Sequence, residues 1–164
     1  MMMLTPFKNF SVATNHGWFS GGLIVLRLVI GIDLFLKGID KISGWSAASF
    51  LESSTGPMAA FFQGMAGSVL IDQLNIWGMT LIGLALILGL MVRPAAFFGV
   101  IMMLLYYFAH FVQNTEYGYI DIHIIYILVF ILFLAGGIGH IFGLDGTIYR
   151  HFRKKKMLGK LFFG

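Results

Sequence analysis

Cysteine is absent from the chain, and charged residues are scarce. With no cysteine among its 164 residues, the protein cannot form structural disulfides, thiolate-held zinc sites or cysteine-held iron–sulfur clusters. Charged residues make up 11% of the chain and hydrophobic residues 59%, whereas about 25% of a soluble domain is charged. The composition excludes a water-soluble globule, and any redox chemistry needs a group other than a thiol.

Positive charge is concentrated in one segment. The basic residues behind the formal net charge of +4 crowd into the tail at residues 148–164. Nucleic-acid binding would need them spread along a soluble face, so no nucleic-acid partner is expected. Membrane lipids are the expected surroundings, and the tail suits contact with anionic lipid heads.

Four apolar stretches are long enough to cross a bilayer. A hydrocarbon core of about 30 Å requires about 20 helical residues at about 1.5 Å each. The stretches lie at residues 21–41, 73–91, 95–112 and 119–142. Arg93-Pro94 lies between the second and the third, and it predicts a tight antiparallel hairpin there. The predicted fold is an all-α integral membrane protein, a four-transmembrane-helix bundle that forms one membrane domain over residues 1–164.

The connections between these spans predict an orientation. Eight of the eleven Lys and Arg residues fall in segments that four spans would place on one side, and loops 42–72 and 113–118 hold none. By the positive-inside rule both termini are cytoplasmic and these two loops are outside. The first outer loop is expected to contain short interfacial helices within Ser46–Leu51 and Met58–Leu70, on either side of Gly56-Pro57.

The first span carries five ionisable residues, each of which costs a few kcal/mol or more near the bilayer centre. At about 100° per residue two adjoining stripes form. One contains Arg27, Gly31, Leu34, Gly38 and Lys41, and the other Asp33, Lys37 and Asp40. In a structural interpretation, Asp33 and Lys37 pair and Arg27 bonds carbonyls of another helix. We favour a functional one, in which Arg27, Lys37 and Lys41 line a polar cavity for an anionic or carbonyl-bearing ligand.

Depth along the spans predicts a convergent polar set in the outer half of the bundle. Lys37 and Lys41 share that half with Tyr106, His110, Asp121, His123 and Tyr126, and Asn75 and Trp77 of the second span lie at a similar level. Such proton-active groups indicate a ligand or reaction site, although a hydrogen-bond cluster that closes the end of the bundle is the alternative. Haem b held by His110 and His123 is disfavoured, because no second histidine pair could carry electrons across the membrane. No metal site is predicted.

Three stretches of sequence carry a resemblance to a known family. The matching positions are Leu26-Arg27-Leu28 with Gly31, Phe35, Gly38 and Lys41, then Gly78, Ile82-Gly83-Leu84-Ala85-Leu86, Leu88-Gly89-Leu90 and Arg93, and finally His123-Ile124-Ile125-Tyr126 with Gly143-Leu144-Asp145. Through their order and the four-span layout, over about residues 22–146, the chain resembles the DoxX-like membrane family. That family includes the DoxD subunit of thiosulfate:quinone oxidoreductase.

The resemblance implies oxidation of thiosulfate to tetrathionate at the outer face, with electrons passed to membrane quinone and a second subunit as partner. It places the chain in the cytoplasmic (inner) membrane of a prokaryote, in a complex with another protein subunit or as a homo-oligomer. For quinone chemistry the expected catalytic residues are Lys41, His110, Asp121 and His123, and the expected cofactor-binding residues are Arg27, Lys37, Tyr106 and Tyr126. The alternatives are a non-catalytic accessory or assembly subunit and, third, a transporter, which the lack of repeats disfavours.

Overall fold

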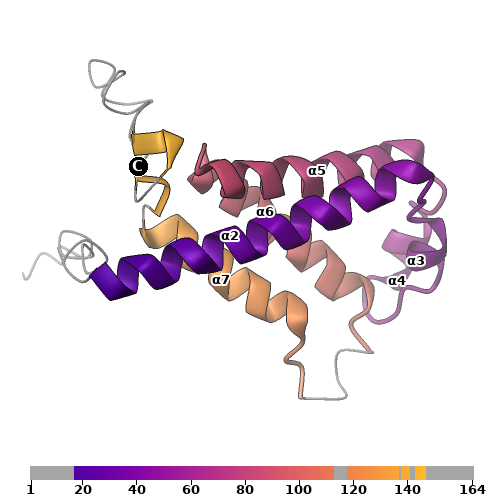
Figure 1. The fold of residues 1–164 in the computed structure, drawn as a ribbon. Coiled ribbons are helices and arrows are strands. Elements are labelled where there is room, and N and C mark those ends of the chain that lie inside the picture. Colours follow the sequence, from indigo (N-terminus) through magenta and orange to yellow (C-terminus); the bar gives the residue numbers. More distant parts are fainter. Residues whose placement is uncertain (1–16, 113–117, 137, 141–142, 147–164) are drawn as a thin grey trace, which may run out of the picture.

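The computed structural model describes residues 17–112, 118–136, 138–140 and 143–146, so the predicted basic tail at 148–164 lies outside the described residues. Helices make up most of what is described (Figure 1). In chain order they are α2 (Gly17–Asp40), the 3-10 helix η1 (Lys41–Ser43), α3 (Ala48–Glu52), α4 (Ala59–Gln63), α5 (Val69–Leu88), α6 (Val92–Ala109), α7 (Ile122–Gly136) and the 3-10 helix η3 (Ile138–His140).

Three of these helices are long and apolar enough to cross a membrane: α2 continued by η1, α5, and α6. The fourth predicted span, 119–142, is shorter than expected, because α7 covers only 15 residues. The chain enters α7 through Gly118 and Tyr119, both with positive φ, and the α-helix ends at Gly136. At about 1.5 Å per residue, α7 spans roughly 22 Å against a core of about 30 Å. A fourth crossing stays a prediction.

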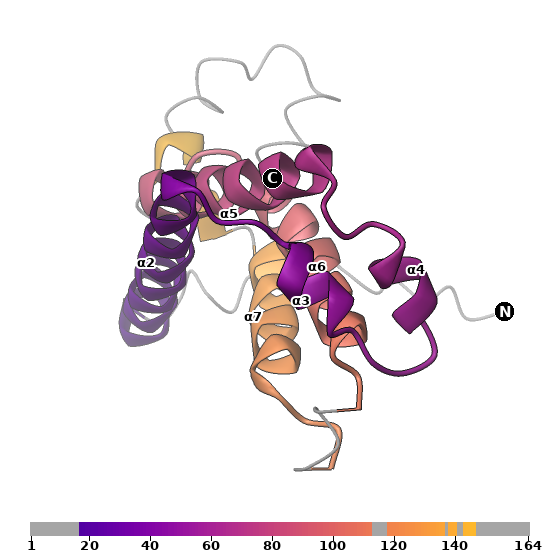
Figure 2. The same ribbon diagram turned by 90° about the vertical axis from the view of Figure 1, so that its right-hand side faces the viewer.

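Helix α5 returns alongside α2 at very short range (Figures 1 and 2). A Cβ added at Gly38 would lie 2.6 Å from the backbone nitrogen of Thr80, and one at Gly83 would lie 2.7 Å from the carbonyl oxygen of Gly31. No real side chain fits at such distances, so these positions need glycine. Gly38 and Gly83 thus allow the backbones of α2 and α5 to approach closely.

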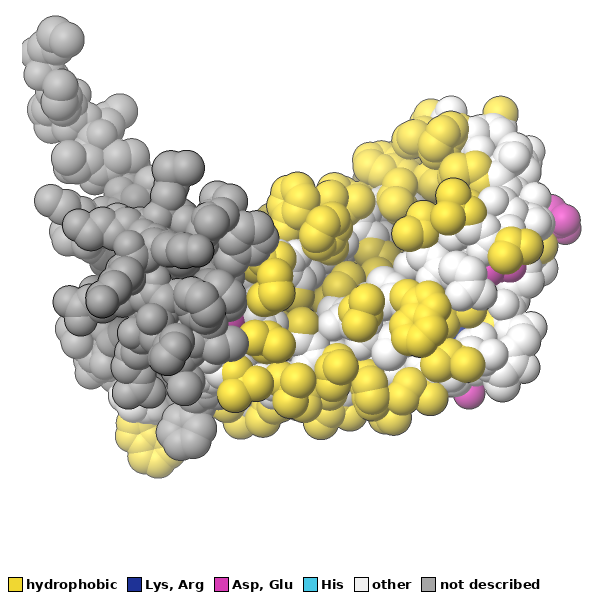
Figure 3. Space-filling model, turned by 90° about the horizontal axis from the view of Figure 1, so that it is seen from above, with side chains coloured by type: hydrophobic (Ala, Val, Ile, Leu, Met, Phe, Trp, Pro, Cys, Tyr) yellow, Lys and Arg dark blue, Asp and Glu magenta, His cyan; other side chains and the backbone are white. Residues whose placement is uncertain are grey.

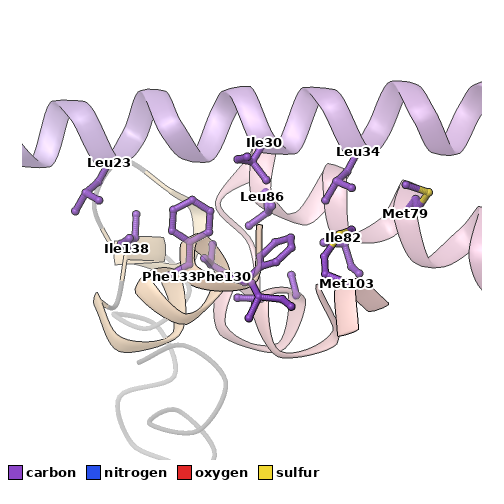
Figure 4. Close-up of a cluster of buried hydrophobic side chains, with 14 residues drawn as sticks. Leu23, Ile30, Leu34, Met79, Ile82, Leu86, Met103, Phe130, Phe133 and Ile138 are labelled. Atoms are coloured by element: carbon purple, nitrogen blue, oxygen red, sulfur yellow. The ribbon is translucent and has the colours of Figure 1, made fainter. Parts of the chain in front are cut away.

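The main core fills the space between α2 and the other three long helices. Leu34 of α2, Leu86 of α5 and the rings of Phe130 and Phe133 of α7 are almost completely buried there (Figure 4). Outside this core the surface is also apolar, as expected for helices surrounded by lipid (Figure 3). Because the buried and the exposed faces of each helix are both apolar, buried positions differ from exposed ones in the shape and close packing of their side chains.

The predicted short helices of the first long loop are present as α3 and α4, on either side of Gly56-Pro57. Both lie at the end of the bundle where α2 ends, and α4 is on the side away from α2 (Figure 2). Leu51 and Phe62 pack with Ala109 in a second, smaller core. The loop is further attached by a 2.9 Å hydrogen bond from the Thr55 amide to the Ala109 carbonyl. It is thus a folded cap on the end of α6.

The predicted hairpin between the second and third spans is confirmed. Helix α5 ends at Leu88 with Gly89 as its C-cap, and α6 begins directly after Met91, which has a φ of 51°. The Asp145 carboxylate accepts hydrogen bonds from the amides of Met91 at 2.6 Å and Val92 at 3.1 Å. Its own amide donates to the Gly89 carbonyl at 3.0 Å. Residues near the C-terminus thereby close this turn and satisfy the first amides of α6.

Candidate functional site

The candidate site is built around Lys41, the residue that follows α2. Its ammonium donates hydrogen bonds to Asn75 Oδ1 at 2.8 Å and to the Tyr106 hydroxyl at 2.9 Å. It also lies 3.3 Å from Met79 Sδ, and 3.9 Å from the centre of the Trp45 ring. An ammonium has three donors, so each of them has a partner, and the aromatic face adds a cation–π contact.

None of these partners carries a formal charge. The ion pairs found among the described residues are Lys37 with Asp33 and His123 with Asp121, and neither includes Lys41. A half-buried ammonium needs hydrogen bonds to offset the loss of water, and here neutral oxygens supply them. The Lys41 ammonium therefore forms no ion pair among the described residues, although the Asp40 carboxylate lines the same cavity, and it can attract an anion or a carbonyl oxygen.

Tyr106 connects Lys41 to the predicted histidine. Its hydroxyl also accepts a 2.6 Å hydrogen bond from Asn75 Nδ2. Its ring stacks on the His123 ring, with centres 5.6 Å apart and planes 6° from parallel. His123 Nδ1 in turn bonds the Asp121 carboxylate, whose second oxygen accepts from the Ile124 amide at 3.1 Å and so caps α7. A carboxylate, an imidazole, a phenol and an ammonium thus follow one another in contact.

These groups line a cavity of about 280 Å³. Five of the eight predicted site residues belong to its wall: Lys37, Lys41, Tyr106, His123 and Tyr126. Asp121 joins them through His123. The cavity is close to the lower end of the range typical of small-molecule sites, about 300–1,000 Å³, and it combines apolar walls with a few convergent polar groups. It can accept a small ion or one ring.

The predicted pairing of Asp33 with Lys37 is confirmed by an Nζ–Oδ2 distance of 2.8 Å. The same carboxylate oxygen accepts a 2.5 Å hydrogen bond from the Tyr126 hydroxyl. This contact links α7 to α2 beside the cavity. Lys37 itself is exposed and lines the cavity, so its pair with Asp33 lies at the rim.

His110 lies near the site but does not line the cavity. Its Nε2 is 3.1 Å from the Phe50 carbonyl oxygen, and its ring packs on the Phe50 ring at 4.2 Å. It therefore attaches the α3 segment to the end of α6. Sequence depth placed His110 at the correct level of the bundle, but the level alone could not show which side of α6 it occupies.

The structure does not bring Arg27 to the cavity. Arg27 is 2% exposed, and its Nη1 donates to the Ile138 carbonyl at 3.2 Å. It lies fourteen residues before Lys41, roughly 20 Å away along the helix. The shared stripe on α2 is real, but its two ends meet different neighbours. For Arg27 the structural interpretation, a bond to a carbonyl of another segment, is confirmed.

Two members of the cluster, Asn75 and Trp45, are not among the predicted site residues. Asn75 carried a usable signal, since a polar amide within an apolar span is expected to have a buried partner. Trp45 carried none, because a tryptophan just after a membrane helix is common at the lipid interface. Its place over Lys41 depends on how the loop folds back.

Long apolar helices that pack around a polar cluster define a multi-pass helical membrane protein. The DoxX family model matches residues 22–111, more than half of the chain, so the chain belongs to the DoxX family. The matched segment runs from α2 to the end of α6 and includes Lys41, Asn75 and Tyr106, whereas α7 with His123 lies beyond it. No curated protein and no solved structure matches the chain.

Proposed function

We propose that this DoxX-family protein is the membrane subunit of a quinone-linked oxidoreductase, of the thiosulfate:quinone type. The observation that supports the proposal is the continuous contact from Asp121 through His123 and Tyr106 to Lys41. It joins a proton donor and acceptor pair to a cation at the level of the membrane helices. A two-electron exchange with a lipid-soluble molecule needs both.

The residues of the cluster fit a quinone. When bound, a quinone supplies two-electron chemistry, taking up two electrons and two protons. The Asn75 amide and the Tyr106 hydroxyl are hydrogen-bond donors that would hold its carbonyl oxygens, and the Lys41 ammonium is bonded to both of these residues. His123, oriented by Asp121, would hold a proton beside Tyr106, and Asp121 would stabilise the imidazolium.

The electron donor is proposed to be thiosulfate, approaching through the cavity. Two thiosulfate ions each lose one electron and join through a new sulfur–sulfur bond, giving tetrathionate. Both ions are anionic, and the cavity wall holds the two ammonium groups of Lys37 and Lys41 against the one carboxylate of Asp40. Positive charge in a cleft raises the local concentration of anions and speeds their association.

A non-catalytic accessory subunit is the second candidate, and one observation favours it. The polar groups of α2 are largely satisfied within the chain: Asp33 bonds both Lys37 and Tyr126, and all three donors of Lys41 have partners. Such internal pairing also occurs where polar residues only fix helix packing. The two candidates differ in whether quinone binds.

The test uses His123→Ala and Lys41→Met, assayed with the partner subunit present in native membranes. We expect both variants to lose at least tenfold in thiosulfate-dependent quinone reduction while retaining the parent's abundance. Glu52→Gln, which removes an exposed charge from α3, is the control and should retain activity. Full activity in both variants would reject the catalytic proposal and favour the accessory subunit.

We further propose that the Lys41 end of the bundle faces outward and both termini face the cytoplasm of a prokaryote, with the fourth crossing made by α7 and its flanking residues. The chain contains no cysteine, so single cysteines report position without background. Ser53→Cys, exposed after α3, should react with a membrane-impermeant maleimide in intact cells. Lys155→Cys should react only after permeabilisation, and its labelling in intact cells would overturn the orientation.

A further inference from the structure

A second, larger hollow lies beside the cavity. It is an apolar groove of about 700 Å³ between α5, α6 and the α3–α4 segment. Of the residues around it, Tyr106 is the one that also lines the polar cavity. Tyr106 therefore forms part of the wall between the groove and the cavity.

The groove is open toward lipid. Both long helices that line it, α5 and α6, are apolar enough to cross a membrane. Leu81, Phe98 and Leu105 on its sides are 57%, 59% and 47% exposed. Figure 3, which looks onto the α5 side, shows hydrophobic side chains crowded along this face with a hollow between them. A molecule dissolved in the hydrocarbon can enter here without crossing water.

The polar atoms of the groove are neutral and lie below the end of the helix. Gln73, Asn75, Trp77 and Tyr106 supply them, and no Lys, Arg, Asp or Glu lines the groove among the residues that the structure describes. Asn75 is six residues after Val69, the first residue of α5, and so about 9 Å along the helix. A phospholipid head needs cations and sits at the membrane surface, so this lining does not suit one. Neutral carbonyl oxygens suit an amide and a phenol.

The shape of the groove favours a thin chain over a crossing partner helix. A helix about 10 Å wide and about 30 Å long occupies roughly 2,400 Å³, more than three times the groove. Phe62 and Leu51 of the α3–α4 segment also line it, at the end where α2 terminates. A spanning helix would have to pass this segment, whereas a thin hydrocarbon chain can end beneath it.

We propose that the groove is the entry and binding site of the isoprenoid quinone, which rests on the proposed function above. The hydrocarbon chain contacts the apolar side of the groove, including Leu81 and Phe98. The carbonyl-bearing ring meets Asn75 and Tyr106. The polar cavity on the other side of Tyr106 is then left for the anionic reductant and for protons, so the two substrates never compete for one space.

The test compares two matched double variants, both Leu→Trp on α5 and α6. Leu81→Trp with Leu105→Trp fills the groove, while Leu84→Trp with Leu104→Trp adds the same bulk at exposed positions that do not line it. Each protein is incubated with decylubiquinone in mild detergent and purified, and the quinone and phospholipid retained per chain are extracted and quantified. We expect the groove pair to retain at least tenfold less quinone than the parent and the control pair to retain the parent's amount.

A second measurement does not depend on the folding of the filled variant. Trp77 lines the groove and Trp45 lies on Lys41, so Trp18→Phe combined with Trp45→Phe leaves Trp77 as the reporter. Decylubiquinone should quench the fluorescence of Trp77 saturably. In a matched protein that keeps Trp45 as the reporter instead, the fluorescence should be quenched less. Linear, unsaturable quenching of Trp77 would overturn the groove site.

The outcomes separate the two proposals. Equal quinone retention by the groove pair and the parent overturns the groove site and leaves the quinone-linked function standing. No quinone retained by the parent overturns both. If the parent retains phospholipid that the groove pair loses, while both proteins retain the same amount of quinone, the occupant of the groove is a phospholipid and not the quinone.

Discussion

Arg27 and Lys41 stand on the same stripe of α2, one near each end of the bundle, and their surroundings differ. Arg27 is buried beside Asp145 and Ile138. The packing around it is so close that a Cβ added at Gly89 would lie 2.9 Å from the Arg27 Nη1. Lys41 is held by neutral groups and faces a cavity.

The comparison separates two uses of a membrane-buried cation. At the Arg27 end the charge lies near a carboxylate, and the space is filled by backbone. At the Lys41 end the charge has no carboxylate within ion-pair distance among the described residues, and the space beside it is empty of side chains. The first arrangement stabilises a turn, and the second leaves room and charge for a ligand.

Replacing each cation by methionine tests this difference and should give the largest effect. Arg27→Met leaves the Ile138 carbonyl and Asp145 without the guanidinium, and we expect a loss of about 3–5 kcal/mol in the free energy of unfolding. Lys41→Met removes a charge whose partners are neutral, and should change stability by less than about 1.5 kcal/mol. Reversible unfolding in detergent measures both. Equal losses would show that Lys41 is as structural as Arg27.

Close packing of α2 on α5 is expected to contribute less at any one position. Gly83→Val would force side-chain atoms against the backbone of Phe35 and Gly31, at a cost of about 1–3 kcal/mol. Gly21→Ala on α2 meets no atom within 4 Å and should stabilise by up to about 1 kcal/mol. The same unfolding measurement applies. A neutral Gly83→Val would mean that the two helices separate easily.

The smallest effect is expected at the rim of the cavity. Lys37→Gln removes an exposed pair with Asp33 at i, i+4, and such pairs contribute about 0.3–0.5 kcal/mol. Asp33 keeps its hydrogen bond from Tyr126. The melting temperature should therefore fall by no more than a few degrees. A larger fall would place Lys37 among the structural cations, with Arg27.

Hydrophobic length was sufficient to predict most of the helical layout. Residues 21–41, 73–91 and 95–112 predict α2, α5 and α6 to within a few residues, because lipid-facing and core-facing side chains are both apolar. The same uniformity hid the end of α7, which lies at Gly136: after Asp121, the apolar run from 119 to 142 contains no Asp, Glu, Lys or Arg to mark a break.

The sequence predicted in which half of the bundle the site residues lie, but not which of them contact one another. Helical rise placed Lys41, Tyr106 and His123 in the same outer half of the bundle, and all three line the cavity. Which of the residues at that depth meet depends on helix rotation and on the folded α3–α4 segment, and neither follows from spacing. His110 shows this, since its ring packs on Phe50 of α3 instead of joining the cavity.

The hydrogen bonds from Met91 and Val92 to Asp145 also bear on the order in which the protein is made. Met91 precedes Asp145 by 54 residues, so at about 5–20 residues per second roughly 3–11 s of synthesis separate them. During that interval the first amides of α6 have no carboxylate to bind. Because unpaired amides are costly in hydrocarbon, the turn must stay in contact with water until Asp145 has been made. Closure of the bundle at this end therefore has to follow the synthesis of α7 and cannot accompany that of the α5–α6 hairpin.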